Sequence, residues 1–566
     1  MVPRTRQRTF GADVVRVTAL GGLEEVGKNM MVFEYRNDII IIDMGFQFPT
    51  EEMPGIDFVI PDVSYLEDKK DRIRGVIFTH GHYDHVMAAP FLLPKTGYPR
   101  MYATALTKGM LEKILSEHAL GQPPVINVIN PEKDVLRLGS FQVEFFRVNH
   151  NIPDSIGVIL TTPVGTFIHT GDFKFDMTPV NEPVTDFAKI AAVGQRGVLA
   201  LFSDSTNAEQ AGYAVSEREI KKMMEQIFNE AEGRIIVASF SSLLARIQQV
   251  FDATAKYGRK VGVFGRSMAN NIEIGLKLGY LKASPQLFLK PNELNRQPDE
   301  KVVILSTGSQ GEDNAGLARM SRGEHKQVKI KKGDTVILSS SVIPGNERSV
   351  VTLYDGLLAQ GANVFYQKIM DVHTGGHAKQ EELKMMIALT KPKYLIPIHG
   401  ERHMRVAHQK IGFAMGLTED KVLLPDNSQV MEFGAFGGRV TDKRVPSSFV
   451  MVDGLGVGDV GQVVLRDRQL MSKDGIFVII VTVDHRSGSL VSSPDIISRG
   501  FVYLRESEKL LADTRSMIKK IMAKGVHEGI PADWSHIKMR VREEIGQFLY
   551  DETRRRPMII PVVIEV

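Results

Sequence analysis

The chain has 566 residues, of which 43% are apolar and 24% are charged, an ordinary balance for a globular protein. It contains no cysteine, which excludes disulfides, thiolate zinc fingers and iron–sulfur clusters. Its formal net charge of +3 is too small to attract a polyanion by itself, so any nucleic-acid site must be a local basic patch. A length of this size predicts about three to four domains.

The N-terminal segment from Met1 to Asp13 contains Arg4, Arg6 and Arg8 but lacks the apolar core of a signal peptide. No stretch of the sequence approaches the roughly 18 uninterrupted apolar residues of a membrane span. We therefore expect a cytoplasmic protein that does not enter a membrane. Further basic runs occur at Lys326 to Lys332 and at Arg554 to Arg556, although such runs more often form solvated faces than binding sites.

The most informative stretch is His80-Gly81-His82-Tyr83-Asp84-His85, which directly follows the apolar residues Val76 to Phe78. Imidazole nitrogen and carboxylate oxygen are ligands that suit Zn²⁺ and, with more oxygen, Mn²⁺. A strand that ends here would place His80 and His82 on one side, and the following turn would present Asp84 and His85 to a neighbouring point. Two pairs of ligands suggest two metal ions.

Further ligands must come from elsewhere in the chain, and three candidates each stand at the end of an apolar run typical of a strand. These are His150 after Phe145 and Phe146, Asp172 after Ile168, and His399 after Tyr394 to Ile398. Taken singly, each is more often a capped turn residue or a hydrogen-bonded polar group of the core. Together with the first cluster, they are favoured as metal ligands.

The pattern changes over residues 207–366, where helical segments alternate with short apolar strands at 235–237, 261–264, 302–305, 336–338 and 364–366. This alternation predicts a mostly parallel sheet covered by helices. Because candidate ligands resume at His399, we interpret the block as an insertion into the metal domain, which would span 1–206 and 367–440. Residues 441–460 are expected to form a linker. The apolar run 476–481 and helical patterns near 506–523 and 534–550 predict a small α+β domain over 461–566.

The order of these motifs resembles the metallo-β-lactamase superfamily, and the later motifs resemble the ribonuclease J family within its β-CASP group. The resemblance covers nearly all of the chain. It is carried by the ligand motif and by the segments Gly21–Asn29, Asp43–Gly45, His169–Asp176, Ser203–Glu209, Gly265–Met268, Thr307–Glu312, Ile343–Glu347 and Arg555–Met558.

The resemblance implies an α/β fold: a metallo-β-lactamase αββα sandwich with an inserted β-CASP α/β domain and a small C-terminal α+β domain. It also implies two divalent metal ions, with Zn²⁺ favoured and Mn²⁺ or Mg²⁺ as alternatives. We assign His80, His82 and His150 to the first ion, and Asp84, His85 and His399 to the second. Asp172 would bridge the two ions, and Asp43 would orient a ligand histidine. A carboxylate in the position of Asp43 could also simply serve a turn.

The expected catalytic residues are Asp84, His377 and Asp204. By resemblance, His377 assists departure of the leaving group as an acid, and Asp204 orients its ring. Residues expected to bind the substrate are Ser239, Phe240, Ser241, Ser242, Arg266, Ser267, His373, Thr374, Gly375, Gly376 and His377. Phe240 could stack on a base, although a phenylalanine in such a place is more often part of the core. His373 could equally serve packing.

The activity implied by the resemblance is hydrolysis of single-stranded RNA that carries a 5′-monophosphate, by 5′-to-3′ exonuclease and endonuclease action, in rRNA processing and mRNA decay. A homodimer or homotetramer and RNA-decay partner proteins are also expected. The chain departs from the family pattern at Gly375, where a serine is usual, and at Leu243 and Ala245, where asparagine and histidine are usual. Weaker discrimination of the 5′ end is therefore expected.

Two other functions are compatible with the ligand motif. A thioester or lactone hydrolase would share it but would not need the inserted block or the motif at 373–377. A catalytically silent RNA-binding or scaffold subunit would keep the fold and lose ligands, whereas every expected ligand is present in this chain.

Overall fold

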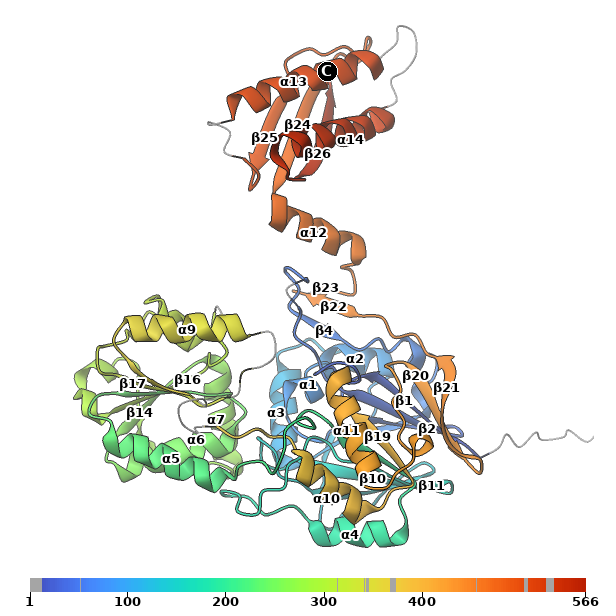
Figure 1. Cartoon of the computed structure of the whole chain (residues 1–566), viewed down its shortest axis with the longest axis vertical. Helices are drawn as coiled ribbons and strands as arrows, with labels where there is room; N and C mark the ends of the chain where they lie inside the picture. The colour runs from blue at the N-terminus through green and yellow to red at the C-terminus, as the bar shows by residue number, and fades with distance from the viewer. Residues whose placement is uncertain are drawn as a thin grey trace, which may run out of the picture. The chain divides into compact units, whose positions relative to one another are not determined.

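The computed structural model describes residues 13–50, 52–312, 314–340, 342, 346–366, 373–454, 456–502, 507–525 and 534–566 (Figure 1). They separate into two compact units. The first contains the described residues up to Gln47 together with Ile60–Phe449, and the second contains Phe48–Val59 and Val450–Val566. The basic residues Arg4, Arg6 and Arg8 and the motif residues 343–345 lie outside the described residues.

Two sheets face each other in the first unit. One has eight strands in the order β21-β20-β1-β2-β3-β5-β6-β7, and the other has six in the order β19-β12-β11-β10-β9-β8. Their facing surfaces meet in a fully buried core that includes Phe33, Phe202 and Phe433, and the rings of Phe33 and Phe202 lie 5.3 Å apart. The continuous burial of Ile39 to Ile42 in β3 is typical of a strand covered on both faces.

Helices cover the outer faces, which gives the αββα sandwich. Helices α4, α10 and α11 pack on the six-stranded sheet through Ile190, Met386 and Ile411, and α3 contacts β6 and β7 of the eight-stranded sheet. The strands are β1 Val15–Gly21, β2 Met30–Tyr35, β3 Asp38–Ile42, β5 Ile73–Ile77, β6 Met101–Ala103, β7 Ile126–Val128, β8 Leu136–Leu138, β9 Phe141–Arg147, β10 Ile156–Thr162, β11 Gly165–His169, β12 Ala200–Asp204, β19 Tyr394–Ile398, β20 Gln429–Gly434 and β21 Gly437–Arg444. The helices are α1 Tyr83–Val86, α2 Ala89–Thr96, α3 Ala105–Ser116, α4 Phe187–Arg196, α10 Gln380–Thr390 and α11 Arg402–Ala414.

A third sheet, entirely parallel, lies between β12 and β19 in the sequence and has the order β15-β14-β16-β13-β17-β18. The predicted parallel sheet is therefore confirmed. Helices bury apolar side chains on both of its faces. Its elements are α5 Glu217–Glu230, β13 Ile235–Ala238, α6 Leu244–Lys256, β14 Lys260–Phe264, α7 Arg266–Leu278, β15 Phe288–Leu289, β16 Val302–Ser306, α8 Gly316–Ser321, β17 Thr335–Leu338, α9 Glu347–Ala359 and β18 Asn363–Phe365.

The second unit contains a sheet of order β25-β24-β26 on which α13 and α14 pack, and a smaller sheet of order β23-β22-β4. Its elements are β4 Phe58–Ile60, β22 Val450–Asp453, β23 Gly456–Val457, α12 Gln462–Asp474, β24 Ile476–Val483, β25 Asp495–Arg499, α13 Glu508–Gly525, α14 Trp534–Thr553 and β26 Met558–Glu565. The predicted strand at 476–481 and both predicted helices are present.

Two local features differ from the sequence-based expectation. Residues 441–460 carry the end of β21 and the strands β22 and β23, where a plain linker was expected. Residues 48–59 belong to the second unit, because Ile56 and Val59 pack on Met451 and Leu465. Among the described helices, none combines the length and the apolarity that crossing a bilayer requires.

Candidate metal centre

The candidate ligands stand just beyond the carboxyl ends of four strands. His80 to His85 follow β5, His150 follows β9, Asp172 follows β11 and His399 follows β19. Strands β9, β11 and β19 run in the same direction, so their ends meet at one edge of the sheet. Helix α1 starts directly after His82, which turns Asp84 and His85 toward the same point.

The first ligand group consists of His80, His82 and His150, whose ring nitrogens converge. Nδ1 of His82 lies 3.1 Å from Nε2 of His80 and 3.0 Å from Nε2 of His150. Burial lowers the pKa of all three rings, that of His82 to about 4. A neutral imidazole keeps the lone pair that a metal ion needs.

The second group consists of Asp84, His85, Asp172 and His399. Oδ2 of Asp84 lies 3.5 Å from Nε2 of His85 and 3.3 Å from Nε2 of His399. Burial alone would raise the pKa of Asp84 and Asp172, but the neighbouring histidines outweigh it and hold both values well below 3.8. Both carboxylates are therefore charged at neutral pH.

Asp172 lies between the two groups. Its Oδ2 atom is 3.7 Å from Nε2 of His80 and 3.8 Å from Nε2 of His150, and it is 3.2 Å from Nε2 of His85 and 3.8 Å from Nε2 of His399. A single oxygen thus faces nitrogens of both groups. This placement is compatible with a carboxylate that bridges two ions.

Polar partners fix the ring orientation of the histidines from behind. Nδ1 of His85 lies 2.8 Å from Oδ2 of Asp43, and that carboxylate also accepts hydrogen bonds from the backbone and hydroxyl of Thr79. The contact expected between Asp43 and a ligand histidine is therefore present. Nδ1 of His150 donates to the carbonyl of Gly376 at 2.7 Å. In each ring the other nitrogen, Nε2, is left facing the ligand group.

A similar chain lies behind His399. Its Nδ1 is 2.7 Å from the hydroxyl of Thr206, which donates to Oδ1 of Asp204 at 2.8 Å. The other oxygen of Asp204 is 2.8 Å from Nδ1 of His377. Burial alone would lower the pKa of His377, but Asp204 outweighs it and raises that pKa above 6.5. The sequence did not point to Thr79 or Thr206 as supports of the site. Thr206 lies within the segment Ser203–Glu209, and Thr79 directly precedes the ligand motif.

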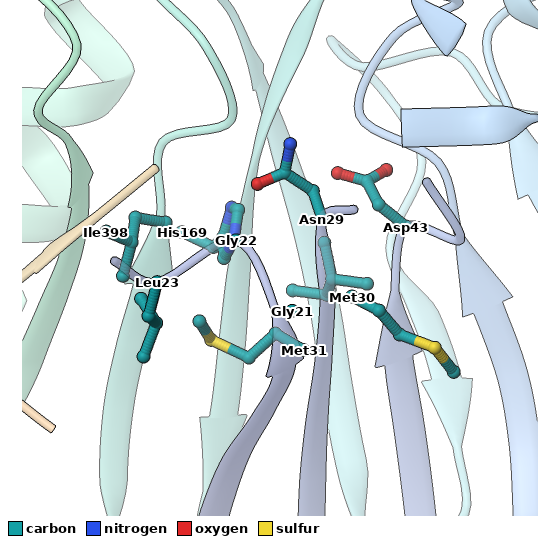
Figure 2. Close-up of a pocket in the computed structure, with 10 residues that line it drawn as sticks. Gly21, Gly22, Leu23, Asn29, Met30, Met31, Asp43, His169 and Ile398 are labelled. Atoms are coloured by element: carbon teal, nitrogen blue, oxygen red, sulfur yellow. The ribbon is translucent and has the colours of Figure 1, made fainter. Parts of the chain in front are cut away.

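The donor set fits divalent cations, because imidazole nitrogens and carboxylate oxygens form the two groups described and a third group that overlaps the second and consists of Asp172, Asp204, His377 and His399. The atoms within each group lie within 4.8 Å of one another. A small cavity is lined by residues of the β1–β2 segment and by Ile42, Asp43, His169 and Ile398 (Figure 2). Figure 2 shows the Asn29 amide in its wall. That amide nitrogen is 3.1 Å from Nε2 of His85 and 3.2 Å from the carbonyl of Asp84.

Comparisons with known proteins agree with this architecture. Family models match four successive segments: the metallo-beta-lactamase superfamily over residues 23–211, the ribonuclease J beta-CASP domain over 232–357, the Zn-dependent metallo-hydrolase RNA specificity domain over 364–416, and the ribonuclease J C-terminal domain over 463–566. Ribonuclease J2 of Bacillus subtilis is 42% identical over 552 residues, which cover 98% of this chain and 99% of the relative. Ribonuclease J 1 of Streptococcus pyogenes is 40% identical over 97% of both chains. The chain belongs to the ribonuclease J family.

Ribonuclease J membership confirms the fold class and the family that the motifs indicated. The family assignment shows that the chain is a metal-dependent nuclease. It does not favour the alternatives of a thioester or lactone hydrolase or of a catalytically silent RNA-binding or scaffold subunit. A crystal structure of a protein of unknown function from Enterococcus faecalis V583 matches with a TM-score of 0.54 at 16% identity, over 74% of this chain and 100% of that one. This likeness shows a shared fold.

The residues expected to bind the substrate fall into two sets in this ribonuclease J chain. Gly376 and His377 lie beside the ligand groups, where Gly376 contacts His150 and His377 contacts Asp204. The hydroxyl of Thr374 donates a hydrogen bond to the carbonyl of Val215 at 2.7 Å. Ser239 to Ser242 follow β13, and Arg266 and Ser267 begin α7 after β14, so both loops lie at the carboxyl edge of the parallel sheet. Within the described part of the chain, no hydrogen bond or ion pair joins Arg266 or Ser267 to the candidate ligands. Phe240 is half-buried.

His373 lies in a buried group of charged residues at the boundary of the inserted sheet. Oε2 of Glu217 accepts hydrogen bonds from Arg246 at 2.9 Å and from Gln249 at 3.0 Å, and Lys174 lies 3.6 Å from Oε1. Burial and the nearby Arg246 lower the pKa of His373 to about 3, so its ring is neutral. Lys174 is only two positions beyond Asp172, so this group links the metal centre to the inserted domain.

Proposed function

We propose that the chain is a binuclear ribonuclease that hydrolyses single-stranded RNA from its 5′ end and also cleaves internally. The observation that carries the proposal is the position of Asp172, whose Oδ2 faces nitrogens of both ligand groups at 3.2 to 3.8 Å. The neighbouring pair of Asp204 and His377 offers a proton donor and a carboxylate that orients it. A protein that only binds metal would not need such a pair.

The proposed ligand sets are His80, His82 and His150 for one ion and Asp84, His85 and His399 for the other, with Asp172 shared. Two such cations, when bound, acidify water and neutralise the charge of a phosphate group. The prevalence of imidazole favours Zn²⁺, and the carboxylates also suit Mn²⁺. The chain itself fixes the ligand rings through Asp43, Thr206 and the Gly376 carbonyl.

His377 is the proposed acid. Burial alone would lower the pKa of this ring, but Asp204 outweighs it and raises the pKa above 6.5, which favours the protonated form that an acid needs. Its Nδ1 is engaged by Asp204, which leaves Nε2 as the atom that would give its proton to the leaving 3′ oxygen. Asp204 keeps the ring in that orientation and compensates the charge of the imidazolium.

The finer features of the proposal rest on the family resemblance. They are recognition of a 5′-monophosphate through the loops at 239–242, 266–267 and 373–377, action in rRNA processing and mRNA decay, assembly as a homodimer or homotetramer, and association with RNA-decay proteins. The proposed domains are 1–206 with 367–440, the insertion 207–366, and 461–566 joined through 441–460. A single strand is favoured because unstacked bases are open to contact by side chains such as Phe240.

The decisive experiment compares the purified chain with an Asp172→Asn variant on 5′-labelled single-stranded RNA and on a duplex of the same sequence. Each protein is tested with added Zn²⁺, with added Mn²⁺ and after treatment with a chelator. We expect metal-dependent cleavage of the single strand by the natural chain and none by the variant. Full activity of a variant that still binds two ions, or cleavage that resists chelation, would contradict the proposal.

A further inference from the structure

The backbone of His399 has an unusual conformation. Its φ angle is +49°, in the left-handed region that residues with a side chain rarely adopt. Such a conformation is unfavourable for a residue with a side chain and persists only where the surroundings hold it. The neighbouring strand β19 ends at Ile398, so this strained residue is the turn that directs the imidazole toward Asp84 and Asp172.

Backbone contacts hold the turn from two sides. The amide of His399 donates to the carbonyl of Gly22 at 3.0 Å, and its carbonyl accepts from the amide of Ser205 at 3.2 Å. The following Gly400 forms bridges with Leu23 and Glu25. The segment Gly21–Asn29, which we call the N-terminal loop, is therefore the frame on which the turn rests. Part of this loop is seen in Figure 2.

The N-terminal loop is itself strained and needs support. Glu24 has a φ of +60° and Lys28 a φ of +53°. The side chain of Asn427 accepts a hydrogen bond from the amide of Leu23 at 3.1 Å and donates to the carbonyl of Leu23 at 2.6 Å. The loop that follows α11 is thus joined to the frame of His399.

One fully buried side chain connects all of these parts. Arg405 on α11 has no exposed surface. Its Nε donates to the carbonyl of Pro397 at 2.9 Å, two residues before His399, and its Nη2 donates to the carbonyl of Pro425 at 2.7 Å. Its Nη1 forms an ion pair with Glu24 of the N-terminal loop. The wide planar guanidinium holds its donors in fixed directions and so reaches all three acceptors, whereas a lysine ammonium is a compact charge with three rotatable donors on one nitrogen.

We infer that Arg405 is a positioning residue of the second metal site, which acts by holding the left-handed turn at His399. It joins the strand before the ligand to the two loops that frame it. The inference rests on the proposed assignment of His399 to the second ion, and the experiment below separates the failure of one from the failure of the other.

The test measures metal binding to the full chain by titration with Zn²⁺ and, separately, with Mn²⁺, and counts the ions bound. The variants are Arg405→Met and Arg405→Lys. Arg234→Met is the matched control, because Arg234 is also buried, donates to Asp334 at 2.9 Å and to the carbonyl of Lys329 at 2.7 Å, and lies beside β13 of the inserted domain.

We expect Arg405→Met to bind one ion as the natural chain does and the other about 10- to 100-fold more weakly, the usual effect of removing an outer support of a metal ligand. Arg405→Lys should recover part of this loss. The control should lower the midpoint of thermal unfolding and leave both affinities unchanged. A purely structural role for Arg405 would make it behave like the control.

Unchanged affinity for both ions in a folded Arg405→Met variant would overturn the inference. A His399→Ala variant measured in parallel tests the underlying assignment: if it also keeps both ions, the assignment of His399 is wrong. Should Arg405→Met fail to fold, Arg405→Lys and Glu24→Gln decide, because each retains part of the network. Weaker binding of one ion by both variants supports the inference. Binding of both ions with the affinity of the natural chain, in both variants, refutes it.

Discussion

Asp204 and His377 are joined by a contact of 2.8 Å between Oδ2 and Nδ1, while the other oxygen of Asp204 accepts the hydroxyl of Thr206, which contacts Nδ1 of His399. One carboxylate therefore serves both the proposed acid and a proposed metal ligand. Changes at His377 and at Asp204 should consequently have different effects on metal binding, although both should slow cleavage.

The first prediction concerns this pair. His377→Ala should reduce kcat about 10²- to 10⁴-fold, the usual contribution of a general acid, and should leave both metal ions bound. Asp204→Asn should reduce kcat and also weaken one ion, because the chain through Thr206 to His399 is altered. Single-turnover rates and metal analysis of the same samples separate the two cases. Equal metal loss in both variants would count against the division of roles.

A second prediction concerns the close approach of Gly376 to His150. A Cβ at this position would lie 2.5 Å from Cε1 and 2.6 Å from Nδ1 of His150. Gly376→Ala should therefore displace the ring, break its hydrogen bond to the Gly376 carbonyl and weaken the first metal ion. Gly375→Ala is the matched control, because its Cβ would meet only Nδ2 of Asn207 at 3.1 Å. Metal titration of both variants checks the expectation, and it fails if the two behave alike.

The third prediction concerns recognition of the 5′ end. Gly375 is half-buried and has no left-handed φ, so its backbone accepts a side chain. A hydroxyl donor added there should strengthen the hold on a 5′-phosphate by about 0.5 to 1.5 kcal/mol, which is roughly two- to twelve-fold. Gly375→Ser should raise the ratio of rates on 5′-monophosphate and 5′-hydroxyl RNA by that factor. An unchanged ratio at full activity would place the pocket elsewhere.

The fourth prediction concerns acid stability. Burial alone would raise the pKa of Glu217, but Arg246 and Lys174 outweigh it and lower the pKa from 4.5 to about 2. A lowered carboxylate pKa contributes stability above pH 4.5 that is lost as the pH falls toward 2, and the difference corresponds to about 3 kcal/mol.

Glu217→Gln should therefore unfold at a lower temperature than the natural chain at pH 7. The gap between the two unfolding temperatures should narrow below pH 4.5. Thermal unfolding followed from pH 7 to pH 3 tests this dependence. Glu219→Gln, on the exposed face of the same helix, is the control and should show no such gap. A gap that stays constant with pH would mean that Glu217 is not charged in the folded protein.

Sequence patterns pointed to the residues that converge in the candidate metal centre and predicted the parallel sheet, because both are expressed locally. The ligand motif follows a strand directly, and runs such as Val302 to Leu305 show their burial in their own composition. The residues that support the candidate ligands could not be predicted from local patterns. Thr206 reaches His399 and Arg405 reaches Glu24 across long intervals of sequence, and neither residue type signals a partner by itself. The place of residues 48–59 in the second unit could not be predicted for the same reason, because the residues they pack against begin only at Met451.

The insertion between β12 and β19 affects the order in which the nuclease can form during its own synthesis. Asp84 meets His399 across 315 residues, and the edge of β1 pairs with β20 near residue 430. A growing chain that has emerged only to the end of the inserted sheet has one incomplete ligand group and an open sheet edge, whatever has already folded upstream. Fragments released before His399 should therefore carry no nuclease activity toward the messenger that encodes them.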